Sequence, residues 1–137
     1  MTIKYLAIPY SHTDDYMKEL RFEVANAVSA RLMKEGEVIF SPISHSHPMA
    51  KYGLPGDWDY WKDQDIMFLN VCSEFYVVML KGWKESTGVS AEIAHMEQRG
   101  IDIQFIDPYA DETISELVEK HDDYLNTKGG HYVRKTM

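Results

Sequence analysis

The sequence predicts an α/β protein with an open, doubly wound, mainly parallel sheet of four to five strands and helices on both faces. Three observations predict this fold class. Short apolar runs such as Phe75–Leu80 are typical of buried parallel strands. They alternate with stretches in which apolar residues recur every three or four positions, as on one face of a helix. The 137 residues show no repeat and no linker, so we expect one domain, 1–137.

The first strand is expected over Ile3–Ile8. A helix follows, since apolar residues recur there at helical spacing; these are Met17, Leu20, Val24, Val28 and Leu32. Thr13 or Asp14 can cap the start of this helix, and Gly36 can end it. Val38–Phe40 is expected to form a short second strand.

The segment 41–56 is expected to be a long loop, because three prolines and two glycines interrupt it. A loop of this length inside a compact domain is often functional. Helices and strands then alternate again: the helices are expected from Asp57 to about Cys72, up to Arg99 and through Ile114–Leu125, and the strands at Phe75–Leu80 and Ile101–Ile106. His121 is expected at the edge of the last helix, and the tail offers a short candidate fifth strand at His131–Arg134.

Composition and charge exclude several functional classes. A net charge of −8 with scattered basic residues disfavours nucleic acid as a partner and favours a small molecule. Cys72 is the only cysteine, which excludes an internal disulfide and fits a cytoplasmic protein. No apolar run has the roughly 18 residues of a membrane helix, and the N-terminal residues do not read as a signal peptide. We therefore expect no membrane association.

In a flavodoxin-like strand order 2-1-3-4, the order reverses between the first and third strands. Ligands of such sheets bind at this switch point, beyond the carboxyl ends of the strands. The two segments expected there are Pro9–His12 and Lys81–Gly88. Tyr10, Ser11 and His12 are therefore candidate ligand-binding residues.

The segment from Ser86 to Glu92 is the first candidate for chemistry. Ser86, Thr87 and the free N–H groups at a helix start can bind an anion, and Gly88 lets a ligand approach the backbone. The alternative is an ordinary serine or threonine helix cap. Glu92 lies about one turn further on and borders the apolar face, where it either projects toward the crevice or is a solvated glutamate of the first turns.

Two further features are candidates. Asp65 falls inside a stripe formed by Trp58, Trp61, Phe68 and Cys72, so it either needs a partner or a function there, or lies at the edge of the buried face. His45 and His47 would share one face of a strand and could bind a metal. No further ligand cluster accompanies them, so we expect no metal and a polar substrate loop instead.

Three stretches, in this order along the chain, resemble the nucleoside 2-deoxyribosyltransferase superfamily: Asp63–Leu69, Phe75–Leu80 and Ser86–Ala94. Within it, the pattern is similar to the 2′-deoxynucleoside 5′-phosphate N-hydrolases. Tyr5–His12 resembles the family's first strand and substrate loop. The stretch Phe40–Pro48 is similar to an uncharacterised branch grouped with these enzymes.

The resemblance implies the same doubly wound fold and a role for each matching residue. Glu92 matches the nucleophile that attacks the anomeric carbon of the sugar. Asp65 matches the aspartate that holds the sugar or handles the proton passed to the base. Ser86 and Gly88 match the segment that binds the 5′-phosphate or 5′-hydroxyl. The remaining expected substrate-binding residues are Tyr10, Ser11, His12, His45 and His47.

We therefore expect an enzyme that cleaves the N-glycosidic bond of a (deoxy)nucleoside or its 5′-monophosphate, by hydrolysis or by transfer of the glycosyl group to another base. No cofactor is expected. Because family members commonly build their site across a dimer, a homodimer or higher homo-oligomer is expected. The alternatives are an NAD-type dinucleotide glycohydrolase and a nucleotide-binding module without catalysis.

Overall fold

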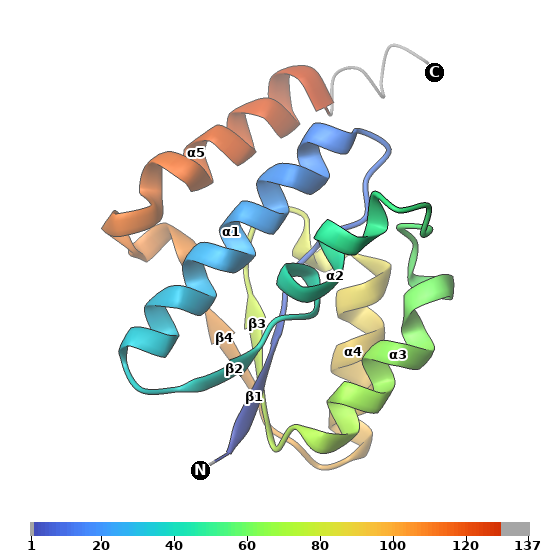
Figure 1. Ribbon diagram of the computed structural model, residues 1–137. Coiled ribbons are helices and arrows are strands. Elements are labelled where there is room, and N and C mark those ends of the chain that lie inside the picture. Colours follow the sequence, from blue (N-terminus) through green and yellow to red (C-terminus); the bar gives the residue numbers. More distant parts are fainter. Residues whose placement is uncertain (1, 130–137) are drawn as a thin grey trace.

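The computed structural model describes residues 2–129 and confirms the predicted fold class. One all-parallel sheet contains four strands in the order β2-β1-β3-β4 (Figure 1). The strands are β1 (Ile3–Ala7), β2 (Val38–Phe40), β3 (Glu74–Val78) and β4 (Ile103–Ile106). The candidate fifth strand at 131–134 lies outside the described residues.

The pairing of β1 creates the expected switch point. Tyr5 of β1 is in register with Phe40 of β2 on one side and with Phe75 of β3 on the other. The chain therefore leaves β1 toward one edge of the sheet and later continues toward the opposite edge. The carboxyl ends of β1 and β3 lie side by side, which is where such sheets hold their ligands.

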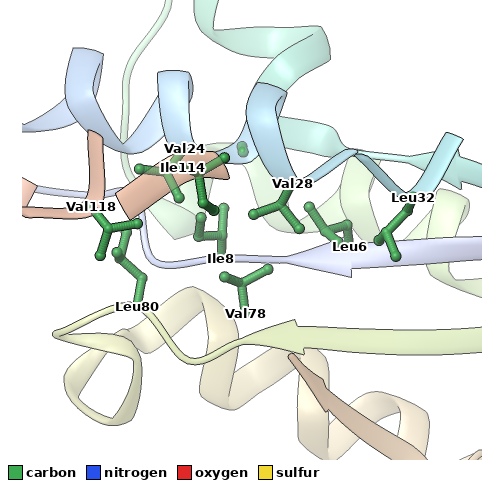
Figure 2. Packing of buried hydrophobic residues seen from close by; sticks show 10 residues of the cluster. Leu6, Ile8, Val24, Val28, Leu32, Val78, Leu80, Ile114 and Val118 are labelled. Atoms are coloured by element: carbon green, nitrogen blue, oxygen red, sulfur yellow. The ribbon is translucent and has the colours of Figure 1, made fainter. Parts of the chain in front are cut away.

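Helices cover both faces of the sheet. On one face lie α1 (Asp15–Lys34) and α5 (Ser115–Tyr124), and on the other lie α3 (Trp58–Val71) and α4 (Thr87–Gln98) (Figure 1). Figure 2 shows the core on the α1 side, where Val24 and Val28 pack toward Leu6 of β1 and Val78 of β3. A second core on the other face is formed by Tyr5, Ala7, Leu69, Cys72, Phe75, Val77, Val89 and Met96.

The long helix α1 begins and ends where the sequence predicts. Asp14 is its cap, because its carboxylate accepts hydrogen bonds from the backbone N–H of Tyr16 at 2.8 Å and of Met17 at 3.3 Å. Gly36 follows the helix with a φ of 90°, a conformation that glycine adopts readily. Of the two caps considered, Asp14 is thus the correct one.

The prediction of a continuous loop over 41–56 is wrong. Residues Pro42–Ala50 form a helix, α2, capped by the Ser41 hydroxyl, which accepts from the Ser44 N–H at 3.3 Å. Pro42 occupies a first-turn position, where a proline is favourable because its missing N–H would have no helical partner. Pro48 lies near the end of the helix. Only the residues between α2 and α3 are a loop.

The prediction that His121 lies at a helix edge is also wrong, since this side chain is completely buried between α5 and α1. A buried histidine is accommodated there because both of its ring nitrogens are hydrogen-bonded. Within residues 2–129, none of the helices combines the length and the apolar character that crossing a membrane requires.

Candidate functional site

A pocket of about 600 Å³, including its open mouth, lies at the carboxyl ends of β1 and β3. Its walls come from four parts of the chain: the segment after β1, helix α2, helix α3 and the first turns of α4. Small-molecule sites of open α/β sheets commonly sit at such switch points. The position is the one predicted from the strand order.

Glu92 of α4 lies in this pocket and is almost fully buried, with 5% of its surface exposed. The alternative that it is a solvated glutamate is therefore wrong. The Tyr5 hydroxyl, from the centre of β1, donates a hydrogen bond to Glu92 Oε2. Burial raises the pKa of Glu92 from 4.5 to about 8; the Tyr5 hydrogen bond opposes this rise, and the charge of Asp65 adds to it.

Asp65 of α3 is the second buried carboxyl group of the pocket, with 7% of its surface exposed. Burial raises its pKa from 3.8 to about 7. The charge of Asp65 also raises the pKa of Tyr5, so Glu92, Tyr5 and Asp65 form one electrostatic group. Two carboxyl groups with raised pKa values in one pocket are typical of sites that transfer protons or attack substrates.

Ser86 and Gly88 line the same pocket at the start of α4. The interpretation of Ser86 as a helix cap is confirmed, and its role in anion binding stays a prediction. Its Oγ accepts from the Val89 N–H at 3.2 Å and thus caps the helix, while the residue still faces the pocket. The amide end of α4 therefore adjoins the two carboxyl groups and offers a place for an anionic or hydroxyl group of a ligand.

The structure separates the two histidines of α2. On a helix, positions two apart point in very different directions, whereas on a strand they would share one face. His47 lines the pocket together with Tyr10. His45 does not line it; its ring lies near those of Phe40 and Phe68, with centroids 5.8 and 6.1 Å away. Within the described part of the chain, no group of three or more His, Cys, Asp or Glu side chains is placed to hold a metal ion.

A family model described as a domain of unknown function, DUF1937, matches residues 2–107. The chain belongs to the DUF1937 family. The match runs from the start of β1 to just beyond β4, so it contains every pocket residue named above. Helix α5 lies beyond it. No curated protein matches the chain.

A second pocket of this DUF1937 protein adjoins the first. Ser11, Asp57, Trp58 and Ser86 line both. The predicted residue His12 lies in the second pocket and not in the first, together with Arg21 and Lys81. His12 is held by the loop itself, because its Nδ1 accepts from the Asp14 N–H at 2.9 Å. Ser11 thus lies at the boundary between the first and the second pocket.

Tyr5 and the tryptophans of α3 were not among the predicted site residues of this DUF1937 chain. Trp58 and Trp61 line the first pocket. They were assigned only to an apolar stripe, because a tryptophan of a core and one of a pocket wall follow the same helical spacing. Tyr5 carried one usable signal, since its polar hydroxyl interrupts an otherwise apolar strand and needs a partner when buried.

We expect that Tyr5→Phe raises the pKa of Glu92 further. The variant removes the hydroxyl that stabilises the ionised carboxylate and changes little else of this fully buried side chain. Asp65→Asn is expected to act in the opposite direction, because it removes a neighbouring negative charge. Carbon-13 NMR titration of the Glu92 carboxyl group in the three proteins measures both shifts. Equal pKa values in all three would show that the groups do not interact.

Proposed function

We propose that this protein cleaves the N-glycosidic bond of a (deoxy)nucleoside or its 5′-monophosphate, with Glu92 as the nucleophile. The observation that carries the proposal is the buried Tyr5–Glu92 pair beside Asp65, in an open pocket at the switch point of the sheet. A carboxyl group held out of water in this way has a raised pKa, and a titratable group with a shifted pKa in a pocket favours a chemical role.

The proposed reaction starts with attack of a Glu92 carboxylate oxygen on the anomeric carbon. The new C–O bond forms as the C–N bond to the base breaks, and the base leaves with the electron pair and takes up a proton. The transition state resembles an oxocarbenium ion, which a negative carboxylate beneath the sugar stabilises. Tyr5 orients Glu92 and favours its ionised form. Because the pKa of Glu92 is about 8, this form is the minority at neutral pH, and the attack is expected to speed up as the pH rises toward about 8. Water or a second base then attacks the glycosyl ester and releases Glu92.

The remaining walls of the pocket supply contacts for each part of such a substrate. Asp65 is close enough to Glu92 for its charge to raise the pKa of that residue, and its carboxyl group is suited to bind a sugar hydroxyl. Trp58 and Trp61 offer flat apolar surfaces on which a base can stack. The start of α4 at Ser86 and Gly88 suits a 5′-hydroxyl or 5′-phosphate. Binding energy from such a remote group can then orient the sugar over Glu92.

The second candidate is a dinucleotide glycohydrolase that uses the same nucleophile. The adjoining pocket favours it, since this space is open and shares Ser11 and Ser86 with the first. Its lining is of mixed charge and includes Arg21 and Lys81 as well as Asp57, Asp59 and Glu85. A second nucleotide half could occupy it, with its phosphates near these cations. The homo-oligomer and the cytoplasmic location stay predictions.

Chromatographic detection of free base tests the proposal. The purified protein is incubated with ribo- and deoxynucleosides, their 5′-monophosphates and NAD, each with and without an acceptor base. Glu92→Gln is expected to abolish release, whereas Glu97→Gln, an exposed glutamate of the same helix, is expected to retain it. A 2′-fluorinated nucleoside, whose glycosyl ester breaks down slowly, is expected to add its sugar mass to the peptide that contains Glu92.

Each result of this panel has a defined meaning. Nicotinamide release from NAD without release from mononucleotides would favour the second candidate. Nucleotide binding without release of any base would favour a binding module and contradict the proposed reaction. Release that persists in Glu92→Gln would contradict the assigned nucleophile.

A further inference from the structure

Three side chains from three elements form a hydrogen-bonded row that ends in the pocket. The Tyr10 hydroxyl, just after β1, lies 2.6 Å from Nδ1 of His47 in α2. On the other side of the ring, His47 Nε2 lies 2.6 Å from Oε2 of Glu19 in α1. Phe22 packs against the imidazole with the ring centroids 4.4 Å apart, which fixes the plane of the ring. Tyr10 and His47 line the pocket, and Glu19 is at the surface.

The carboxylate of Glu19 decides which ring nitrogen of His47 carries a proton. A carboxylate only accepts, so Nε2 holds the hydrogen and Nδ1 faces the tyrosine. When the ring is neutral, Nδ1 accepts from the Tyr10 hydroxyl. When the ring is protonated, Nδ1–H donates to Tyr10 Oη, and the phenolic hydrogen is free to point into the pocket. The row can therefore pass a proton from the surface to the pocket.

Tyr10 and Asp65 act from different walls of the pocket. The charge of Asp65 raises the pKa values of Glu92 and Tyr5, so Asp65 belongs to the nucleophile's side. The pKa of Tyr10 is raised to about 12 by burial and then by the charges of Glu19 and Asp15. Tyr10 thus keeps its proton at neutral pH. A proton donor that is separate from the nucleophile is what a leaving base requires.

We propose that the Glu19–His47–Tyr10 row is the proton relay that protonates the departing base. This inference rests on the proposed function and assigns the general acid of the proposed reaction. As the C–N bond breaks, its electron pair stays on the base, and the base takes the phenolic proton of Tyr10. The imidazolium of His47 returns a proton to Tyr10, and Glu19 stabilises that imidazolium. His47 is reprotonated from solvent. Tyr10 is the catalytic residue, and His47 and Glu19 are positioning residues.

The test compares two substrates whose bases differ in their need for a proton. A purine nucleoside requires protonation of its leaving base, whereas the N7-methylated purine nucleoside is already cationic and loses a neutral base. We expect Tyr10→Phe to slow release of the ordinary purine about 100-fold or more, the usual range for loss of a general acid, and to change release of the methylated purine by less than about threefold. His47→Asn and Glu19→Gln are expected to show the same substrate dependence, with smaller losses.

Glu23→Gln is the matched control, because it changes an exposed glutamate of α1 one turn beyond Glu19. It is expected to leave both rates unchanged. Equal losses on both substrates in Tyr10→Phe would overturn the relay and leave the proposed function intact. If the wild-type protein releases neither base in a Glu92-dependent manner, the proposed function and the relay both fall. Glu19→Gln keeps the test valid if the pocket variants fail to fold, since Glu19 is exposed.

Discussion

Glu92→Gln is expected to yield an inactive protein that is more stable than the wild type at alkaline pH. Base release should fall at least about 1,000-fold, since an amide cannot act as the nucleophile. The stability gain arises because glutamine has nearly the same shape but never carries a buried charge. Its amide oxygen can still accept from the Tyr5 hydroxyl, so the variant keeps the hydrogen bond of the wild type.

The sign of the pH dependence follows from the raised pKa of Glu92. The folded protein holds this proton up to about pH 8, whereas the unfolded chain releases it near 4.5. The contribution of Glu92 to the free energy of unfolding of the wild type is therefore fully present below pH 4.5, the pKa in the unfolded chain. It is lost as the pH rises through about 8, the pKa in the folded protein. Each unit of pKa difference corresponds to about 1.4 kcal/mol, so the difference between about 8 and 4.5 gives a loss of at most about 5 kcal/mol. The glutamine variant does not titrate and avoids it.

Denaturant unfolding from about pH 5 to about pH 9 measures the effect, with Glu97→Gln as the control at an exposed site of the same helix. The stability difference between Glu92→Gln and the wild type should widen with rising pH. The difference for Glu97→Gln should stay near zero. A constant difference across this range would contradict the burial of an ionisable Glu92.

Arg21→Met is expected to lower the free energy of unfolding by about 2–4 kcal/mol. Arg21 is 5% exposed and connects two distant segments. Its Nε donates to His121 Nε2 of α5 at 3.1 Å, and its Nη1 donates to the Ser11 carbonyl oxygen at 3.2 Å. Methionine keeps the apolar part of the side chain but leaves both acceptors without a donor. His121 is fully buried, so water cannot easily replace the lost bond.

The turn before α4 also depends on the position of Arg21. Gly82 has a φ of 99°, and a Cβ at this position would lie 2.9 Å from Arg21 Nη2.

Lys34→Met is the control for Arg21→Met, since Lys34 is an exposed residue of the same helix, α1. It should change the stability by no more than about 0.5 kcal/mol. If Arg21→Met and Lys34→Met are equally stable, the guanidinium of Arg21 contributes nothing to holding α5 against the segment that follows β1.

The arrangement of the sheet could be predicted because its signals are local. The apolar residues of α1 recur at helical spacing, and Asp14 and Gly36 mark its ends. The run Phe75–Leu80, which contains most of β3, is largely apolar because helices cover both faces of the sheet. The error over α2 has a local cause as well. A proline among other prolines and glycines indicates a loop, whereas Pro42 occupies the first turn of α2, where proline is favourable.

The sequence by itself determined the fold class and the switch point, because helical and strand spacing decide which residues face the core and where strands end. Spacing left two interpretations each for Asp65 and Glu92, and only the family resemblance pointed to these two carboxyl groups. Only the tertiary structure decided which side chains meet. Tyr5 and Glu92 are 87 positions apart, and Arg21 and His121 are 100 positions apart. His47 meets Tyr10 and Glu19 only because α2 is a helix packed beside α1. Such contacts depend on how whole elements pack, and no spacing within one element encodes them.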